Sequence, residues 1–328
     1  MPMNTLQQRT SILIVSWNRA DLLSACLESI RKALPQIPVV VVDNGSSPAL
    51  TPQPNVTWIR SERNLGFAGG NNLGWAHCPG EYVLLLNNDT ILPSAEPLTT
   101  LVDFLDAHPT VAATQAKLIL PDGTLDTCGE FLTPWGVLYH HGYCQPDGPH
   151  AATPFPIYAA KGACCLIRKS ALADCGGHLF RDDYFCYGED LELCHRLWLA
   201  GYEVWFVPTQ PVLHAERATS ELLPSRFVWR HYLSNLLTTA RDYWSLRTWC
   251  QLGLGLLFLL CCGAFLKGVL PLPRHSKLAF TRKREDRDCL PRVTVHISWR
   301  YLLACFTRNF QNTLYPLPKS TPTSQEMK

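Results

Sequence analysis

The stretch Tyr82-Val83-Leu84-Leu85-Leu86-Asn87-Asn88-Asp89-Thr90 decides the fold of this chain. Its apolar run, rich in Val and Leu, is typical of a buried strand in a parallel sheet. A carboxylate directly after such a strand lies at the carboxyl edge of the sheet, where open α/β sheets bind their ligands. Asp89 in that place could hold a hard divalent cation, and the cation could hold a diphosphate. The alternative is a surface turn, because Asn-Asn-Asp-Thr also has favourable turn chemistry.

The composition is that of a globular protein with a large core. The 328 residues are 47% hydrophobic and 17% charged, enough for one large domain or one domain with an appendage. The net charge of +2 gives no global field for nucleic acid, so no nucleic-acid partner is expected. The 14 cysteines are scattered, often within apolar stretches, and form no Cys-x-x-Cys pair. This pattern favours buried reduced thiols over a disulfide framework or a zinc site.

Short apolar segments alternate with amphipathic segments along the first 215 residues. The apolar segments predict strands, and the segments with apolar residues three or four apart predict helices. The alternation predicts an α/β fold whose mostly parallel sheet has helices on both faces. Residues 133–156, rich in Pro, Gly and His, are predicted to form a mobile loop. Strands are predicted at 11–16, 38–43, 56–59, 82–86, 111–120, 163–167 and 204–207, and helices at 21–34, 71–77, 98–107 and 190–200.

The character of the sequence changes after about residue 225. We therefore predict two regions, an α/β domain over 1–225 and a helical region over 226–328. Residues 252–266 carry no charge but are fewer than the roughly 20 that cross a bilayer, and basic residues follow from Arg274 to Arg292. Basic residues beside an apolar segment suit an anionic leaflet, so this region is predicted to lie on the inner membrane leaflet, peripherally or shallowly inserted. The alternative is a buried terminal helix with a solvated loop.

The start of the chain has no signal-peptide pattern, which places the expected catalysis on the cytoplasmic side.

Six motifs in a fixed order carry a family resemblance. They are Val15-Ser16-Trp17-Asn18-Arg19, Val42-Asp43-Asn44-Gly45-Ser46-Ser47, the stretch from Arg63 to Asn72, Asn87-Asn88-Asp89, the stretch from Tyr187 to Arg196, and Val212-Leu213-His214. Together, over roughly residues 11–215, they resemble family 2 glycosyltransferases of the GT-A fold. The run Gly66-Phe67-Ala68-Gly69-Gly70-Asn71-Asn72 is similar to that of bacterial rhamnosyltransferases of cell-surface polysaccharide synthesis. The resemblance implies a hexosyltransferase with dTDP-rhamnose as the expected donor, or a UDP-linked hexose as the alternative.

The resemblance also implies a donor site. Asp43 would accept the ring N–H of a uracil or thymine base, with Val15 and Trp17 lining the same pocket; capping of a turn is the alternative for Asp43. Arg63 precedes a glycine-rich turn and a helix start, where backbone N–H groups attract phosphate. The residues predicted to bind the donor are Val15, Trp17, Asn18, Asp43, Arg63, Asn64, Gly66, Asn71, Asn87 and Asn88.

Asn87-Asn88-Asp89 occupies the place of the family's Asp-x-Asp metal motif. The first position is neutral here, so Asp89 must carry most of the cation binding, while Asn87 can offer only a carbonyl oxygen to a ribose or a cation. The resemblance implies that His214 completes the shell of a Mg²⁺ or Mn²⁺ ion, and imidazole suits Mn²⁺ better. The alternative for His214 is an ordinary loop histidine.

Glu189 and Asp190 open a predicted helix, where the helix dipole stabilises carboxylates. Simple helix capping is one interpretation. The resemblance implies instead that Asp190 is the general base, with Glu189 in support, and takes the proton of an acceptor hydroxyl during attack on the anomeric carbon. The reaction would be a one-step inverting transfer to a glycan or lipid-linked acceptor. Lys161-Gly162-Ala163 could line the acceptor side, and the pair His140-His141 is left unassigned.

Two other classes of function stay open. The neutral Asn87 suits a catalytically silent scaffold protein that binds a sugar nucleotide. A processive polysaccharide synthase is the second alternative, but it needs several membrane spans and a Gln-x-x-Arg-Trp type of motif, and neither is found in the sequence.

Overall fold

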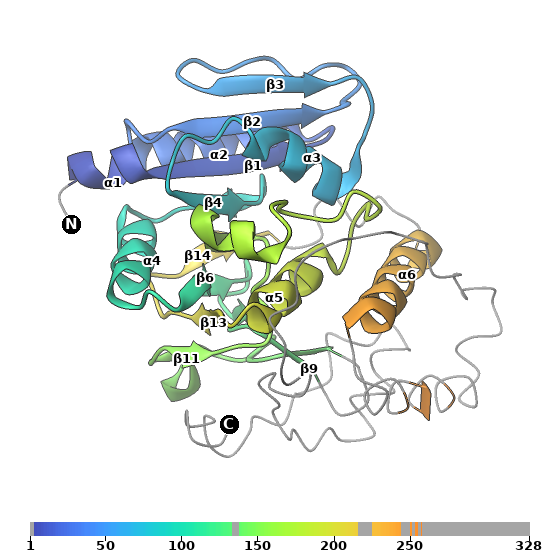
Figure 1. The fold of residues 1–328 in the computed structure, drawn as a ribbon. Helices are drawn as coiled ribbons and strands as arrows, with labels where there is room; N and C mark the ends of the chain where they lie inside the picture. Colours follow the sequence, from blue (N-terminus) through green and yellow to red (C-terminus); the bar gives the residue numbers. More distant parts are fainter. Residues whose placement is uncertain are drawn as a thin grey trace.

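The structure is a computed structural model that describes residues 3–132, 138–215 and 225–243, together with the isolated positions 250, 253, 254 and 257. A central sheet lies between two layers of helices (Figure 1). This is the α/β architecture that the alternation of segments predicts.

Eight strands form the central sheet, in the order β11-β13-β6-β12-β4-β1-β2-β3. The sequential strands β1, β2 and β3, and β4 beside β1, pair in parallel, and so do β13 and β6. β12 runs antiparallel to both of its neighbours, and β11 runs antiparallel to β13. The strands are β1 (Thr10–Ser16), β2 (Val39–Asn44), β3 (Thr57–Ser61), β4 (Tyr82–Leu86), β6 (Val111–Gln115), β11 (Phe155–Pro156), β12 (Cys164–Arg168) and β13 (Glu203–Phe206).

The sheet is therefore mixed, and the prediction of a mostly parallel sheet is correct for one half of it only. The half formed by β4, β1, β2 and β3 is parallel. A parallel connection needs a crossover, usually a helix. Within the described residues no α-helix lies between β6 and β12, and the chain returns antiparallel.

The central strands send alternate side chains into two separate cores. Ile12 and Ile14 of β1 pack under α1, α2 and α4, whereas Leu13, Val40 and Val42 pack under α3 and α5. Because these strands are covered on both faces, their middles are unbroken apolar runs, Ile12–Val15 and Val39–Val42. The helices are α1 (Met3–Arg9), α2 (Ala20–Ala33), α3 (Gly66–Trp75), α4 (Glu96–Ala107), α5 (Glu189–Leu199) and α6 (Ser225–Tyr243), with 3-10 helices η1 (Pro149–Ala151) and η2 (Lys169–Cys175).

Helix α6 packs on the same domain, beside α5 (Figure 1). Its residues Leu236, Ala240 and Tyr243 are buried in the core that α5 shares. The Tyr243 hydroxyl donates a hydrogen bond to Oε1 of Glu192 at 2.7 Å. A boundary at residue 225 separates this helix from its core, so the first helix of the predicted C-terminal region belongs with the α/β domain.

A small second sheet lies beside the carboxyl ends of the central strands. It has the order β5-β14-β7-β8, and a separate pair joins β9 to β10. The single strand predicted at 111–120 is in fact two strands, β6 and β7, which belong to different sheets. The strands are β5 (Thr90–Ile91), β7 (Leu118–Ile119), β8 (Leu125–Thr127), β9 (Glu130–Leu132), β10 (Leu138–His140) and β14 (Val212–His214).

The segment predicted as a mobile loop contains regular structure where it is described. β10, η1 and β11 lie within it. Tyr143, Ala151 and Phe155 are buried in the core, and apolar burial of this kind fixes a segment that has few helix or strand formers. The prediction of an irregular loop is wrong for residues 138–156, and residues 133–137 lie outside the described part.

The cysteines belong to the packed interior. Most of the ten that the structure describes are buried, Cys26 and Cys164 among them. Burial raises the pKa of Cys26 and of Cys164 to about 12, so these thiols stay protonated and unreactive.

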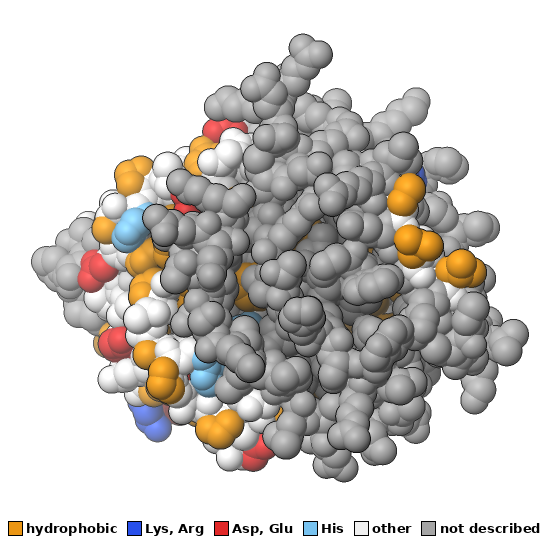
Figure 2. Space-filling model, turned by 90° about the horizontal axis from the view of Figure 1, so that it is seen from below, with side chains coloured by type: hydrophobic (Ala, Val, Ile, Leu, Met, Phe, Trp, Pro, Cys, Tyr) orange, Lys and Arg blue, Asp and Glu red, His pale blue; other side chains and the backbone are white. Residues whose placement is uncertain are grey.

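The predicted membrane-associated stretch 249–270 lies outside the described residues, apart from its four isolated positions. Across the part of the chain that the structure describes, no helix combines the length and the apolar character that a bilayer crossing requires. On the face shown in Figure 2, the described acidic and basic side chains stand singly among hydrophobic ones.

Candidate functional site

A buried pair of side chains lies where β4 and β14 end. Asp89 follows β4, and its Oδ1 lies 3.3 Å from Nε2 of His214, the last residue of β14. The two side chains are 8% and 3% exposed. The antiparallel pairing of β14 with β5 puts His214 opposite Thr90, which explains how residues so distant in sequence meet. The structure thus brings together the two residues predicted to bind a cation.

A second carboxylate orients His214 from the other side of its ring. Nδ1–H of His214 donates to Oδ2 of Asp126 at 2.7 Å. Lys161 Nζ donates to both oxygens of Asp126, at 2.7 and 2.9 Å. Burial alone would raise the pKa of Asp126, but Lys161 and His214 outweigh it and hold that pKa well below its usual range. Asp126 is therefore ionised and fully buried within this polar cluster.

His214 carries a second proton when no cation is present. Burial by itself would lower its pKa, but the hydrogen bonds with Asp126 and Asp89 raise the pKa to about 9. At neutral pH the ring is therefore charged, and its Nε2 proton lies on the side of Asp89. The side-chain amide nitrogen of Asn87 lies 3.2 Å from the same Nε2, so the first and third residues of the Asn87-Asn88-Asp89 motif both face His214.

This pair of side chains fits a divalent cation. Adjacent ligands of an octahedral Mg²⁺, each about 2.1 Å from the ion, lie about 3 Å apart. The separation between Asp89 Oδ1 and His214 Nε2 is close to that value, and the buried Oδ1 has no partner among the described residues other than this long contact with His214. A histidine that binds a metal usually donates its other N–H to a carboxylate, as His214 does to Asp126. No group of three or more His, Cys, Asp and Glu side chains in the described ranges forms a metal site, so a cation held here needs ligands from its substrate or from water.

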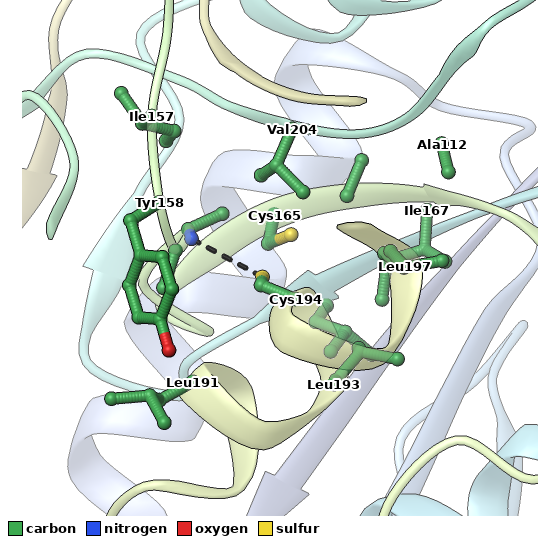
Figure 3. Close-up of a cluster of buried hydrophobic side chains, with 14 of the residues drawn as sticks. Ala112, Ile157, Tyr158, Cys165, Ile167, Leu191, Leu193, Cys194, Leu197 and Val204 are labelled. Carbon is green, nitrogen blue, oxygen red and sulfur yellow. Dashed lines mark hydrogen bonds between the residues drawn. The ribbon is translucent and has the colours of Figure 1, made fainter. Parts of the chain in front are cut away.

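Helix α5 is held in place by its buried face. Leu191, Cys194 and Leu197 lie in a cluster with side chains of β12 and β13 (Figure 3). The backbone N–H of Ala160 donates to Sγ of Cys194 at 3.3 Å, the bond drawn as a dashed line in Figure 3. This packing fixes the first turn of α5, which carries Glu189 and Asp190.

Asp190 joins the cluster through the backbone that follows Lys161. The Gly162 N–H donates to Oδ2 of Asp190 at 3.2 Å, and the Leu191 N–H donates to Oδ1 at 2.8 Å. Burial, followed by the negative charge of Glu130, raises the pKa of Asp190 to about 6. Such a carboxylate is ionised at neutral pH yet has a proton affinity suited to a general base.

Glu189 behaves differently from its neighbour. Its side chain is 6% exposed, and Oε2 makes no hydrogen bond within the described part of the chain. Burial and the adjacent Asp190 raise the pKa of Glu189 well above its usual range. Both causes favour the protonated, neutral form of this carboxyl group over a second negative charge beside Asp190.

The loops after β1 and β2 are tied to each other. The backbone N–H of Asn18 donates to Oγ of Ser46 at 2.9 Å, and Oδ1 of Asn18 accepts from the Ser47 N–H at 2.8 Å. Val15, near the end of β1, and Trp17, on the loop that carries Asn18, are half-buried. The two loops that would form the predicted base pocket are therefore held together by hydrogen bonds, and the pocket itself and its contact with a base stay predictions.

Asp43 makes the contacts of a turn cap. It is fully buried, and its oxygens accept hydrogen bonds from the backbone N–H groups of Ser46 and Leu50, both at 3.1 Å. Arg60 forms an ion pair with the same carboxylate. These contacts are those expected if Asp43 caps a turn, which is the alternative to base binding. A contact between Asp43 and a base would require these groups to rearrange.

The glycine-rich motif builds the start of α3. Gly66 has φ +76°, and a Cβ placed there would lie 2.1 Å from the carbonyl oxygen of Phe185. Oδ1 of Asn64 accepts from the Gly66 N–H at 2.8 Å, and the buried Asn71 amide donates to a backbone carbonyl one turn earlier at 2.9 Å. The contacts of Gly66, Asn64 and Asn71 within the protein are sufficient to explain why these residue types stand at these positions. Arg63 is exposed, and its guanidinium makes no ion pair with the described residues, so it is available to an anion.

Asn88 points away from the pair formed by Asp89 and His214. It is buried, and its amide donates to Oγ of Ser16 at 2.8 Å, which ties the end of β4 to the end of β1. A structural role accounts for this contact, and binding of the donor by Asn88 stays a prediction.

Three polar residues near these motifs were not predicted from the sequence: Asp126, Glu130 and Asn44. Asn44 accepts from the Leu65 N–H and donates to the Gly66 carbonyl, both at 2.9 Å, so it fixes the start of α3. The sequence feature that could have identified Asn44 is its place in the motif Val42-Asp43-Asn44-Gly45-Ser46-Ser47. Asp126 and Glu130 lie in three-residue strands without a readable period, and their only signal is an acidic side chain among apolar neighbours.

The chain matches the family model described as Glycosyl transferase family 2 over residues 11–175. The chain belongs to this family. The match covers the strands and loops that carry Asp43, Asp89 and Asp126, and it confirms the family resemblance. Four of the six motifs lie within the matched residues, and the two that carry Asp190 and His214 lie beyond residue 175.

Relatives of this family 2 chain are found in several bacteria. It is 27% identical over 242 residues to the O-antigen biosynthesis protein RfbC of Myxococcus xanthus, covering 68% of this chain and 19% of that protein. It is 26% identical over 264 residues to the N-acetylglucosaminyl-diphospho-decaprenol L-rhamnosyltransferase of Mycobacterium tuberculosis, covering 70% and 83%. The chain spans a quarter or less of the length of two curated relatives that it matches, 24% and 19%.

The fold is also similar to a solved structure, GalNAc-T7 with UDP, GalNAc and Mn²⁺. The TM-score is 0.54 with 16% identity, and the match covers 74% of this chain and 49% of that one. At this identity the likeness shows the fold alone, and it agrees with the GT-A α/β fold that the motifs predict.

Proposed function

We propose that this chain is an inverting glycosyltransferase that moves a hexose from a nucleoside diphosphate to a hydroxyl group. One observation carries the proposal: Asp89, His214 and Asp190 belong to one connected cluster. Asp89 contacts His214, His214 is hydrogen-bonded to Asp126, and Asp126 is paired with Lys161. Asp190 accepts a hydrogen bond from the residue after Lys161. Membership of the family supports the same assignment.

In this proposal Asp89 and His214 hold Mg²⁺ or Mn²⁺. When bound, the cation neutralises the charge that develops on the departing nucleoside diphosphate. Asn87, which faces the same histidine nitrogen, replaces the first acid of the motif by a neutral amide. The cation site therefore depends on a single carboxylate, and removal of that carboxylate should abolish cation binding.

Asp190 acts on the acceptor. It takes the proton from an acceptor hydroxyl as that oxygen attacks the anomeric carbon on the face opposite the leaving group, and this direct attack inverts the configuration. Its raised pKa of about 6 leaves it ionised at pH 7. Glu189 supports Asp190 from the adjacent position, where burial and the charge of Asp190 raise the pKa of Glu189 and disfavour a second negative charge.

The donor and the acceptor are also proposals. We propose rhamnose as the sugar and dTDP-rhamnose as the donor, with a UDP-linked hexose as the alternative. The acceptor is then a glycan or a lipid-linked sugar of a cell-surface polysaccharide. Support comes from the names of two relatives, an L-rhamnosyltransferase with N-acetylglucosaminyl-diphospho-decaprenol in its name and an O-antigen biosynthesis protein. The exposed Arg63 would face the diphosphate, and the part of the C-terminal region that follows α6, residues 245–328, would lie on the inner membrane leaflet.

A donor screen tests the proposal. Purified full-length protein in detergent would be incubated with dTDP-rhamnose or UDP-sugars, an acceptor and Mn²⁺, and release of nucleoside diphosphate would be measured. Asp190→Asn should lower turnover about 100-fold or more while calorimetry still detects donor binding. Asp122→Asn, on an exposed turn, is the matched control and should keep full turnover. Donor binding without turnover in the unmodified protein would instead identify a silent scaffold.

A further inference from the structure

We propose that Asp126 and Lys161 are positioning residues that hold His214 so that its Nε2, and not its Nδ1, faces Asp89. The inference rests on the proposed cation site and adds residues that no family motif singles out. Neither residue needs to touch the cation or the substrate for this role.

The first part of the argument is the direction of the imidazole ring. The hydrogen bond from Nδ1 to Asp126 Oδ2 is 2.7 Å long, and Asp126 is fully buried. An imidazole with one nitrogen fixed by a buried carboxylate has its other nitrogen fixed as well, because the two atoms belong to one rigid ring. Nε2 then points toward Asp89. Such a carboxylate partner sets the tautomer and orientation of a ligand histidine.

The second part is the charge of Asp126. A buried carboxylate without a counter-charge is strongly destabilising. Lys161 supplies that charge through two short contacts with Asp126. Lys161 is itself held by its backbone N–H, which donates to Oε1 of the buried Gln115 at 2.8 Å. Gln115 in turn donates to the backbone carbonyl of Thr127, next to Asp126, at 2.7 Å. The positioning pair is therefore part of a closed set of hydrogen bonds.

The third part is the link to the proposed base. Lys161 contacts the carboxylate behind His214, and the N–H of the next residue, Gly162, donates to Asp190. The adjacent residues Lys161 and Gly162 thus contact both the cation-binding part and the acceptor part of the proposed site. A displacement of Lys161 should change the cation half and the acceptor half together.

Cation binding by the full chain tests the inference without relying on turnover. Mn²⁺ alone is the probe, and free Mn²⁺ is measured by electron paramagnetic resonance at fixed pH. Asp126→Asn and Lys161→Met should each weaken Mn²⁺ binding about tenfold or more, the size expected for loss of an outer-shell partner. The matched controls are Asp147→Asn and Lys117→Met, which break a similar Lys–Asp pair with contacts of 2.8 and 2.9 Å. Both controls should stay close to the affinity of the unmodified protein.

A second measurement uses the unmodified protein, so it holds even where a variant fails to fold. In protein labelled with ¹⁵N-histidine, addition of diamagnetic Mg²⁺ should shift Nε2 of His214 while Nδ1 keeps its proton. The spectrum of His214→Gln assigns the signals. A Mg²⁺-induced shift at Nδ1 in place of Nε2 would overturn the inference.

The outcomes separate this inference from the function on which it rests. If Asp89→Asn and His214→Gln weaken Mn²⁺ binding but Asp126→Asn does not, the positioning role is wrong and the cation site stands. If the unmodified protein does not bind Mn²⁺, or none of these variants changes its affinity, the cation site is wrong and the positioning role fails with it.

Discussion

Replacement of Asp190 by Asn should make the protein more stable at alkaline pH while it removes the activity. Burial and the charge of Glu130 move the pKa of Asp190 from an ordinary 3.8 to about 6 in the folded protein. At a pH well above 6, this difference of about two pKa units corresponds to about 3 kcal/mol by which ionisation of Asp190 destabilises the folded state. The isosteric Asn does not ionise, so the variant avoids that cost.

The Asp190→Asn variant also loses a hydrogen bond, and this loss reduces its net gain in unfolding free energy. Asp190 accepts hydrogen bonds from the N–H groups of Gly162 and Leu191, and the amide of Asn can accept only one of them well. The lost hydrogen bond costs about 1 kcal/mol. We therefore expect Asp190→Asn to be about 1–2 kcal/mol more stable than the unmodified protein at pH 8, and about 1 kcal/mol less stable near pH 4, where the carboxyl is protonated in both states.

The sign follows from linkage. A carboxyl whose pKa is raised on folding holds its proton more tightly in the folded state, so its contribution to stability is complete below pH 4 and is lost as the pH rises through about 6. The assay is urea unfolding of both proteins at pH 4.5, 6 and 8, at equal ionic strength. Asp122→Asn is the control of opposite sign, because hydrogen bonds from Thr124 lower the pKa of Asp122. A stability difference for Asp190→Asn that is constant or falls as the pH rises would refute the assignment of the raised pKa.

Three further predictions concern the cation, α3 and the end of the chain. Removal of divalent cations with EDTA should abolish transfer, and added Mn²⁺ should restore it; transfer at full rate in EDTA would contradict the roles of Asp89 and His214. Gly66→Ala should cost about 1–3 kcal/mol of unfolding free energy more than Gly177→Ala, because both glycines have φ near +75° but only Gly66 would place a Cβ against backbone. Deletion of residues 245–328, which keeps α6, should release the protein from membranes in a flotation assay, and continued flotation would place the membrane contact elsewhere.

The parallel half of the sheet could be predicted because its strands are buried on both faces. β4 is apolar at every position, and β1 and β2 each contain an unbroken apolar run, Ile12–Val15 and Val39–Val42, which marks them as central strands. The direction of β12 could not be predicted, because Cys164–Arg168 reads as an apolar strand whichever way it runs. The strands of the small sheet are two or three residues long, too short for a period to be visible.

The residues of the candidate site likewise include some that the sequence predicts and some that it does not. Asp89, Asp190 and His214 were predicted because each follows or opens a recognisable element within a motif. Asp126 and Glu130 were not, because what distinguishes them is burial beside other charges, which arises only when separate strands pack together. For Asp43 the motif and the structure suggest different roles. Its motif predicts contact with a ligand, whereas in the structure its carboxylate accepts hydrogen bonds from backbone N–H groups and pairs with Arg60.

The packing of α6 on α5 also determines where the protein can be recombined with its relatives. Tyr243 and Asp242, at the end of α6, bond to Glu192 of α5 and to Arg181 of the preceding loop. A chimaera joined before α6 would strip these partners from the helix that bears Asp190. A chimaera joined after Tyr243 would preserve them, so a C-terminal segment from a relative can be joined there without disturbing the contacts that hold α5.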